Sequence, residues 1–148
     1  MRRAILIFGL MMAAGAAEAG DYVVVASSDP GLIPGQELEG GQQVALGAGR
    51  SVTLVHVGGE LTVLRGGSSG VVVPTRQVAS ADATRVAALK SLIAPPTEGR
   101  TFGGRRGGVC PDPADLQTVD QILSAQAGGC ARQAREAFAT LTNAVGTR

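Results

Sequence analysis

The sequence of 148 residues predicts an α+β fold, in which a small N-terminal antiparallel β-sandwich or barrel is followed by two to three short α-helices. Up to Val73, short runs of branched apolar residues are separated by glycine turns, which is typical of small β-proteins. From Val78 onwards, apolar residues recur every three or four positions, as they do on one face of a helix. Pro74, Pro95-Pro96 and Gly128-Gly129 interrupt these segments and are expected to end them.

Residues 1–19 are expected to be a secretory signal peptide and not part of the fold. Arg2-Arg3 provides a positive start, residues 4–12 are apolar, and residues 17–19 form an A-x-A cleavage signal. The apolar run is shorter than the roughly 20 residues of a membrane-spanning helix, so a permanent anchor is the less favoured alternative. We therefore expect cleavage between Ala19 and Gly20. The mature protein would be periplasmic or secreted, and would contact the membrane only through this peptide before cleavage.

The composition of the mature chain argues against several classes of partner. Losing Arg2, Arg3 and Glu18 leaves 11 of the 13 Lys and Arg residues and 11 of the 12 Asp and Glu residues, so the net charge is zero. Proteins that bind nucleic acid or anionic membranes generally carry a basic surface. A chain of this length fits one domain with a core of its own. The sequence therefore predicts no nucleic-acid partner.

Residues 20–74 are expected to form the β domain. The first strand is expected at residues 21–26, and its run of three valines from Val23 to Val25 predicts burial on both faces or a place near the sheet centre. Proline and glycine turns follow it. Further short strands are expected at residues 36–38, 43–46, 51–57, 60–65 and 71–73.

Gly58-Gly59 separates two of these runs and predicts a two-residue type I′ hairpin turn, since both positions of that turn need positive φ. Val57 would then lie opposite Glu60, and Leu54 opposite Val63. A slip of one residue would move every side chain of one strand to the other face. The expected core face carries Val52, Leu54, Leu61 and Val63, and the opposite face is mixed.

The spacing of turns and apolar residues over residues 22–73 resembles the periplasmic β-domains of the FecR type. The shared pattern is Pro34-Gly35-x-x-Leu38, Gly41, Val44-x-Leu46, Gly49, Val52-x-Leu54 and Gly59-x-Leu61-x-Val63. It is also similar to small secreted proteins of proteobacteria. The resemblance implies a periplasmic β-domain. FecR proteins also have a cytoplasmic tail and a membrane helix, which this chain is expected to lack, so it does not imply transmembrane signalling.

Residues 75–94 are expected to contain a helix that packs over the β domain. Ser80 would cap it, Asp82 would lie in its first turn, and Val86, Leu89 and Ile93 would form its buried face. Residues 95–109 are rich in glycine and arginine. They fit either a flexible linker or an RGG-like contact with nucleic acid, and we favour the linker, because so glycine-rich a chain cannot hold a fixed patch.

Residues 110–148 are expected to be helical and closed by a disulfide between Cys110 and Cys130, the only two cysteines. Asp112 and Pro113 predict a helix start. An unbroken helix over residues 113–127 would be about 22 Å long and would hold the cysteines too far apart for the roughly 7 Å that a disulfide allows. We therefore expect this helix to stop near Leu123 and residues 124–129 to return as extended chain. An intermolecular bridge or two free thiols are the alternatives.

No catalytic, cofactor-binding or metal-binding residues are expected. His56, the only histidine, could be a metal ligand or a base, but its neighbours offer no further ligands, and a half-buried strand histidine is the preferred interpretation. Ser51 and Ser68 are the nucleophiles considered with it. Ser51 would point to the opposite face of the strand, and no G-x-S-x-G motif surrounds Ser68.

We therefore expect an exported, non-enzymatic envelope protein whose small β domain binds or braces a protein partner. The alternative is a secreted inhibitor or a carrier of a small ligand.

Overall fold

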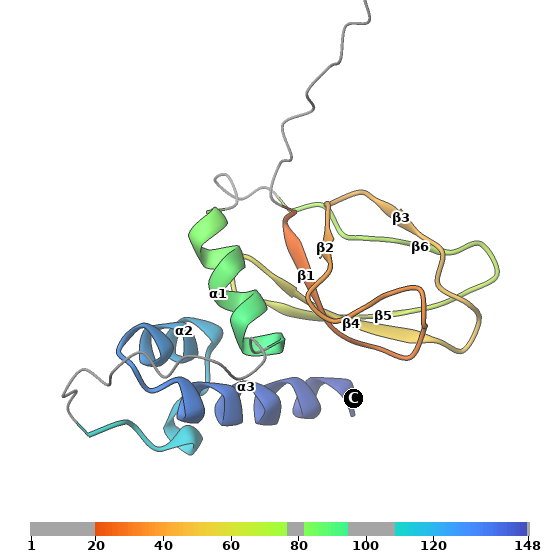
Figure 1. Cartoon of the computed structure of the whole chain (residues 1–148). Coiled ribbons are helices and arrows are strands. Elements are labelled where there is room, and N and C mark those ends of the chain that lie inside the picture. The colour runs from red at the N-terminus through yellow and green to blue at the C-terminus, as the bar shows by residue number, and fades with distance from the viewer. Residues whose placement is uncertain (1–19, 77–81, 95–108, 148) are drawn as a thin grey trace, which may run out of the picture.

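The computed structural model describes residues 20–76, 82–94 and 109–147. They form three layers (Figure 1): a two-stranded ribbon, a four-stranded antiparallel sheet, and a layer of helices on the other face of that sheet. The predicted α+β class is confirmed. The two sheets stay open and do not close into a barrel.

The four-stranded sheet has the order β2-β1-β4-β5, and the ribbon pairs β3 with β6. β1 lies inside the sheet, where Val23 and Val24 are each 0% exposed, so the burial predicted from the valine run is confirmed. The strands are β1 (Tyr22–Ser27), β2 (Glu37–Leu38), β3 (Gln43–Val44), β4 (Ser51–His56), β5 (Leu61–Arg65) and β6 (Val71–Val72).

The predicted register of the β4–β5 hairpin is wrong by one residue. Val55 lies opposite Leu61, where the two-residue turn would place Thr62 opposite it. Only Gly59 has a positive φ, of 92°, so the conformation required by a type I′ turn is absent from this described hairpin. The chain instead turns over three residues, 57–59, with the left-handed glycine last.

This shift reverses the predicted face of every β5 residue relative to β4. Leu61 and Val63 share a face with Val55 and Val57, and this face is turned toward the helices. The face expected to be mixed is therefore buried, with Val55 at 0% and Val57 at 4% exposure.

The sheet separates two hydrophobic cores. The ribbon-side core comprises Tyr22, Val24, Leu32, Leu38, Val44, Leu46, Val52, Leu54 and Val73. The helix-side core comprises Val23, Val55, Val57, Val86, Leu89, Leu92, Leu116, Val119, Ile122, Ala134, Ala137 and Phe138.

The first helix of the helical layer, α1 (Ala83–Ile93), begins later than expected. Its cap is Asp82, whose side chain accepts a hydrogen bond from Thr84 N at 2.9 Å. The expected cap, Ser80, lies outside the described residues. Val86, Leu89 and Leu92 are buried in the helix-side core, and Ile93 is partly buried.

The helical layer continues with η1 (Pro113–Asp115), α2 (Val119–Ala127) and α3 (Ala131–Gly146). No helix within the described ranges is long and apolar enough to cross a membrane. The predicted signal peptide, which ends at Ala19, and nearly all of the predicted glycine- and arginine-rich linker fall outside the described residues.

Candidate functional site

β5 is the longest edge strand in the part of the chain that the structure describes, and it pairs only with β4. Two backbone hydrogen bonds fix which of its residues face that partner. His56 N donates to Glu60 O at 2.8 Å before the strand, and Gly66 N donates to Arg50 O at 2.8 Å after it. Because bonded pairs alternate with non-bonded pairs in an antiparallel ladder, every second residue between them also faces β4.

The remaining residues of β5 form what we call the open edge: the outward N–H and C=O groups of Leu61, Val63 and Arg65. None of these groups makes a hydrogen bond to another described residue. Alternate residues of a strand are about 6.8 Å apart, so the open edge presents an evenly spaced row of donors and acceptors. The side chains from Leu61 to Leu64 are only partly buried.

The surroundings of the open edge differ at its two ends. Glu60, just before β5, forms an ion pair with Arg76. Arg65, the last residue of β5, is exposed and has no ion-pair partner among the described residues. α3 runs below the strand and contacts it (Figure 1), and Leu61 and Leu141 are both partly buried against the helix-side core.

Tyr22 and His56 form a buried polar pair near the β4–β5 turn. They are register partners on β1 and β4, and their ring centroids are 4.7 Å apart at an interplanar angle of 63°. Tyr22 is 0% exposed and His56 is 3% exposed. His56 Nδ1 accepts a hydrogen bond from Gly58 N at 2.9 Å, which places the ring hydrogen on Nε2 when the ring is neutral.

Neither His56 Nε2 nor Tyr22 Oη has a hydrogen-bond partner among the described residues. Burial lowers the pKa of His56; the negative charge of Asp21, and to a smaller extent that of Glu60, opposes this, while the positive charge of Arg76 adds to it. Burial also raises the pKa of Tyr22. The pair is therefore held neutral, and its environment favours a packed structural role over proton transfer.

The candidates for catalysis and metal binding do not come together in the structure. Ser51 and His56 occupy opposite faces of β4, and Ser68 follows the far end of β5. In residues 20–76, 82–94 and 109–147, no three His, Cys, Asp or Glu side chains gather so that they could hold a metal ion.

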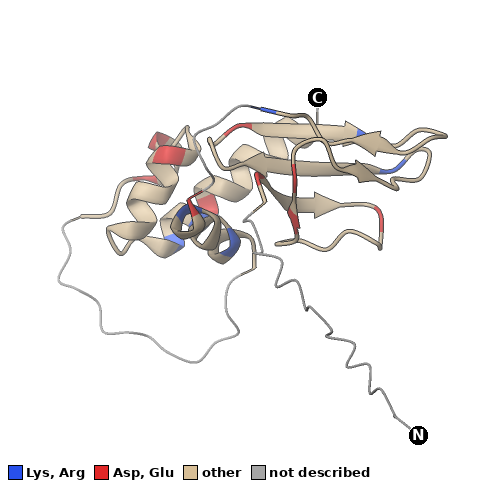
Figure 2. Ribbon diagram, turned by 90° about the horizontal axis from the view of Figure 1, so that it is seen from above, with Lys and Arg blue, Asp and Glu red and all other residues tan. Residues whose placement is uncertain are grey.

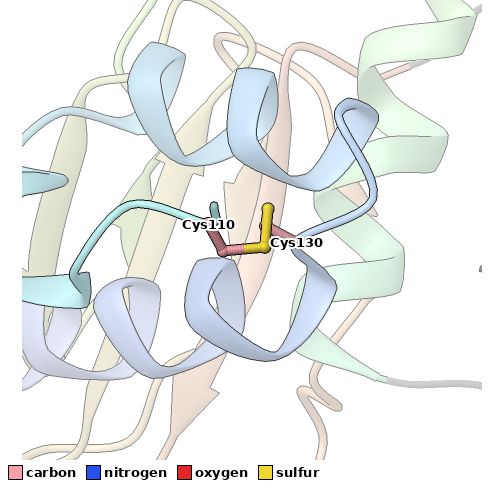
Figure 3. The surroundings of a disulfide bond; sticks show 2 residues. All are labelled: Cys110 and Cys130. Atoms are coloured by element: carbon pink, nitrogen blue, oxygen red, sulfur yellow. A yellow bond between two sulfur atoms is a disulfide. The ribbon is translucent and has the colours of Figure 1, made fainter. Parts of the chain in front are cut away.

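The disulfide between Cys110 and Cys130 is formed, with Cα atoms 5.7 Å apart (Figure 3). The predicted route to it is wrong. α2 extends beyond Leu123 to Ala127 and does not stop early. The chain makes only a short 3₁₀ turn at Pro113–Asp115 and then runs to Thr118, where α2 begins. The segment that spans the length of α2 and so allows Cys110 to reach Cys130 therefore comes before α2 in the chain, and not after it.

Thr118 supplies the signal that the sequence reasoning missed. Its side chain accepts from Gln121 N at 3.3 Å, while Gln121 Oε1 accepts from Thr118 N at 3.1 Å. This reciprocal arrangement is a capping box, and its T-x-x-Q pattern can be read from the sequence. It starts α2 later than Asp112 and Pro113 had suggested.

An open groove of about 540 Å³ lies between the β1–β2 loop and the end of α1. Ile33, on its rim, is 64% exposed. The groove is lined by Ile33, Pro34, Gly35, Gln36, Lys90, Ser91 and Ala94.

Gly20, the first residue after the predicted cleavage position, is buried. Its backbone N donates to Glu37 Oε2 at 3.1 Å, and Glu37 Oε1 accepts from Lys90 Nζ at 2.7 Å. The hydrogen bond from Lys90, with a smaller contribution from Gly20 N, lowers the pKa of Glu37. This carboxylate therefore links the start of the described chain to α1.

Charges of both signs are distributed over the strands and helices (Figure 2). Three ion pairs in the described ranges join elements that are distant in sequence: Glu60–Arg76, Arg85–Asp120 and Glu37–Lys90. Arg85 also donates to Val57 O, so that it fastens the β4–β5 turn to α1 and α2.

No family model matches the chain, and no curated protein or solved structure matches it either. The resemblance to FecR-type β-domains therefore stays a prediction.

Proposed function

We propose that the chain is an exported, non-enzymatic envelope protein whose β domain binds or braces a protein partner through the open edge of β5. The observation that carries this proposal is the row of outward backbone groups at Leu61, Val63 and Arg65, which have no hydrogen bond to any described residue. An unpaired edge of this kind is a template for an added strand.

The chemistry of the edge favours an extended segment of another protein as its occupant. Backbone hydrogen bonds would supply affinity, and the partly buried side chains from Leu61 to Leu64 would contact alternate side chains of the partner. Arg65 favours an acidic residue at the corresponding end of the added strand, since opposite charges across a strand pair stabilise it.

Export to an oxidising compartment is supported by two independent features. The sequence carries the pattern of a signal peptide over residues 1–19. The intramolecular disulfide is of a kind that persists in the periplasm or outside the cell and is rare in the cytosol.

The test of edge binding is a crosslinking capture from the cell envelope with two variants at one position. Val63→Pro removes the outward N–H and leaves the ladder to β4 intact, because prolines are tolerated on strand edges. Val63→Thr keeps the N–H and nearly the same shape. We expect capture of a partner by the wild type and by Val63→Thr, and at least tenfold less by Val63→Pro.

Equal capture by the three proteins would refute the open edge as the binding site. Thermal unfolding of each variant checks that Val63→Pro keeps the fold. If it does not, Val63→Lys replaces it, since a charge on an edge strand opposes strand addition while keeping the backbone donor.

The alternative function, a carrier of a small apolar ligand, is favoured by the groove at Ile33. The groove has a volume of about 540 Å³, and the exposed Ile33 on its rim offers an apolar contact. Saturable binding of an apolar dye that is lost in Ile33→Asp and kept in Val63→Pro would support the carrier over the edge-binding protein.

A further inference from the structure

The backbone nitrogen of Gly20 lies beside a carboxylate that a cationic group already binds. Gly20 N lies 3.1 Å from Glu37 Oε2, and the other oxygen of that carboxylate is already paired with Lys90 at 2.7 Å. A carboxylate shared in this way is an acceptor suited to positive charge on both sides.

Only glycine fits at this position. A Cβ atom added to Gly20 would lie 2.9 Å from Leu38 O, 3.0 Å from Leu38 N and 3.1 Å from Glu37 Cβ. Two of these contacts are with backbone atoms of β2, which cannot move without disturbing the pairing of β2 with β1. The residue that the sequence predicts as the first of the mature chain is thus also one whose backbone nitrogen is hydrogen-bonded to Glu37.

We propose that Glu37 receives the α-ammonium group that cleavage after Ala19 creates on Gly20. The inference rests on the proposed export. In the cleavage, a peptidase of the export route adds water across the Ala19–Gly20 peptide bond. The carbonyl carbon of Ala19 gains the hydroxyl group and becomes a carboxylate, and the nitrogen of Gly20 gains protons and becomes an ammonium group at neutral pH.

Cleavage changes the contact at Glu37 from a hydrogen bond between an amide N–H and the carboxylate to an ion pair. Before cleavage, Gly20 offers one amide N–H. Afterwards it offers three N–H donors and a positive charge, so that attraction between opposite charges is added to the hydrogen bond. Because Glu37 is also bound to Lys90, the carboxylate would then lie between two positive groups and hold the start of the mature chain against β2.

The experiment compares the chain beginning at Gly20 with the same chain acetylated on Gly20 N. Acetylation keeps an N–H donor and removes the charge. We expect acetylation to lower the midpoint of thermal unfolding by about 1–4 °C at pH 7, the shift that corresponds to the loss of one weak ion pair in a domain of this size. In Glu37→Gln, acetylation should cause no shift.

The control variant is Glu39→Gln, which removes an exposed carboxylate two residues away that makes no contact with Gly20. Acetylation should lower its midpoint as in the wild type. The proposal is overturned if acetylation has no effect on the wild type, or if it acts equally in the wild type and in Glu37→Gln.

A second measurement remains decisive if Glu37→Gln fails to fold. The stability difference between the free and the acetylated wild-type chain should be present at pH 7 and should vanish as the pH rises beyond the range where α-amines lose their proton, which begins at about 7.7–8.0. A difference that is unchanged at pH 10 would overturn the proposal.

These outcomes are separable from those of the proposed function. The acetylation experiment uses purified protein and needs no partner, so loss of edge binding does not affect it. A mature chain that begins elsewhere than Gly20 would refute the processing step, even where the purified chain shows the ion pair.

Discussion

The two layers on either side of the four-stranded sheet are built by different means. On the ribbon side, every strand is short and is joined to its neighbours through turns, many with a glycine at positive φ such as Gly41 and Gly70. On the helix side, the sheet is covered by helices of which α1 and α2 have side-chain caps, and a covalent bond between Cys110 and Cys130 ties the segment before η1 to the start of α3. Local turn chemistry therefore organises one layer, and helix caps with a disulfide organise the other.

The sheet between them belongs to both cores, since alternate residues of β1 and β4 point to opposite faces. Val24 and Leu54 are buried toward the ribbon, and Val23 and Val55 are buried toward the helices. We therefore expect the sheet to be the most stable part of the molecule. The helical layer should be able to loosen while the sheet remains folded.

The largest expected effects come from cavities in the two cores. Leu54→Ala and Leu89→Ala each remove a side chain that is 0% exposed, one on either side of the sheet. Each should lower the free energy of unfolding by about 2–5 kcal/mol. Denaturant unfolding measures this loss, and hydrogen exchange locates it.

If the two layers differ in this way, amide hydrogen exchange in Leu54→Ala should become faster throughout the molecule. In Leu89→Ala it should become faster first in the helical layer. If Leu89→Ala raises exchange in β4 as much as in α3, the two layers are one cooperative unit and the distinction is wrong.

Removal of the disulfide should have the next largest effect. The chain-entropy estimate for a bridge with a sequence separation of 20 is on the order of 3 kcal/mol. In the double variant Cys110→Ser, Cys130→Ser, this loss should be confined to η1, α2 and α3, as seen by the exchange of their amide protons. Unchanged protection of the helices would show that packing alone holds this layer.

The β4–β5 turn is a place where the sheet contacts the helical layer, and a substitution at Gly59 tests this contact. Gly59 has a φ of 92°, and an added Cβ would lie 3.3 Å from Val119 Cβ of α2. Gly59→Ala should therefore cost about 1–2 kcal/mol from backbone strain alone. Gly67→Ala is the control, because its Cβ would meet no atom within 4 Å, and it should stay within about 0.5 kcal/mol of the wild type. Equal losses of unfolding free energy in Gly59→Ala and Gly67→Ala would contradict the three-residue turn.

The smallest expected effect is the dependence of stability on pH through His56. Since burial lowers the pKa of His56 from its ordinary value of 6.5, the unfolded chain binds a proton before the folded chain does. Stability should therefore fall as the pH drops below about 6.5 toward the lowered value. Glu37 affects stability at more acidic pH. Its pKa is lowered from the ordinary value of 4.5, so the stability that the ionised carboxylate contributes is lost as the pH falls below about 4.5 and the group becomes protonated.

The measurement is the free energy of unfolding between pH 7.5 and pH 5 for the wild type and for His56→Gln. The neutral variant should lose the part of the slope that begins near 6.5. The same slope in both proteins would mean that His56 does not titrate differently on folding.

Alternating apolar residues and turn signals predict the strands well, but they leave the hairpin register open. Gly58-Gly59 is compatible with a two-residue turn and with a three-residue turn that ends in glycine. The choice depends on tertiary packing, because only the longer turn buries Leu61 beside Val55 and Val57 on the helix side.

The disulfide could be predicted from the cysteine count, but its geometry depends on where a helix begins. Two start signals compete, Asp112-Pro113 and Thr118-x-x-Gln121, and the structure uses the first only for a 3₁₀ turn. The residue pattern identifies both candidate caps but does not show which of them starts the helix. The packing of Leu116 and Val119 into the helix-side core accompanies the start of α2 at the second signal.

The candidate sites could not be predicted, because they arise from strand order and from contacts between distant residues. Nothing local in the sequence of β5 shows that it is an edge strand, and the register of β1 with β2 is what brings Glu37 next to Gly20.

We propose that the protein is exported and processed before Gly20, and that the internal disulfide is closed in the mature chain. The most direct test is the intact mass of the protein recovered unreduced from the cell envelope, with and without alkylation. We predict a chain that begins at Gly20, is two hydrogens lighter than the reduced form and resists alkylation until it is reduced. A full-length mass, or alkylation of Cys110 and Cys130 without reduction, would contradict the account.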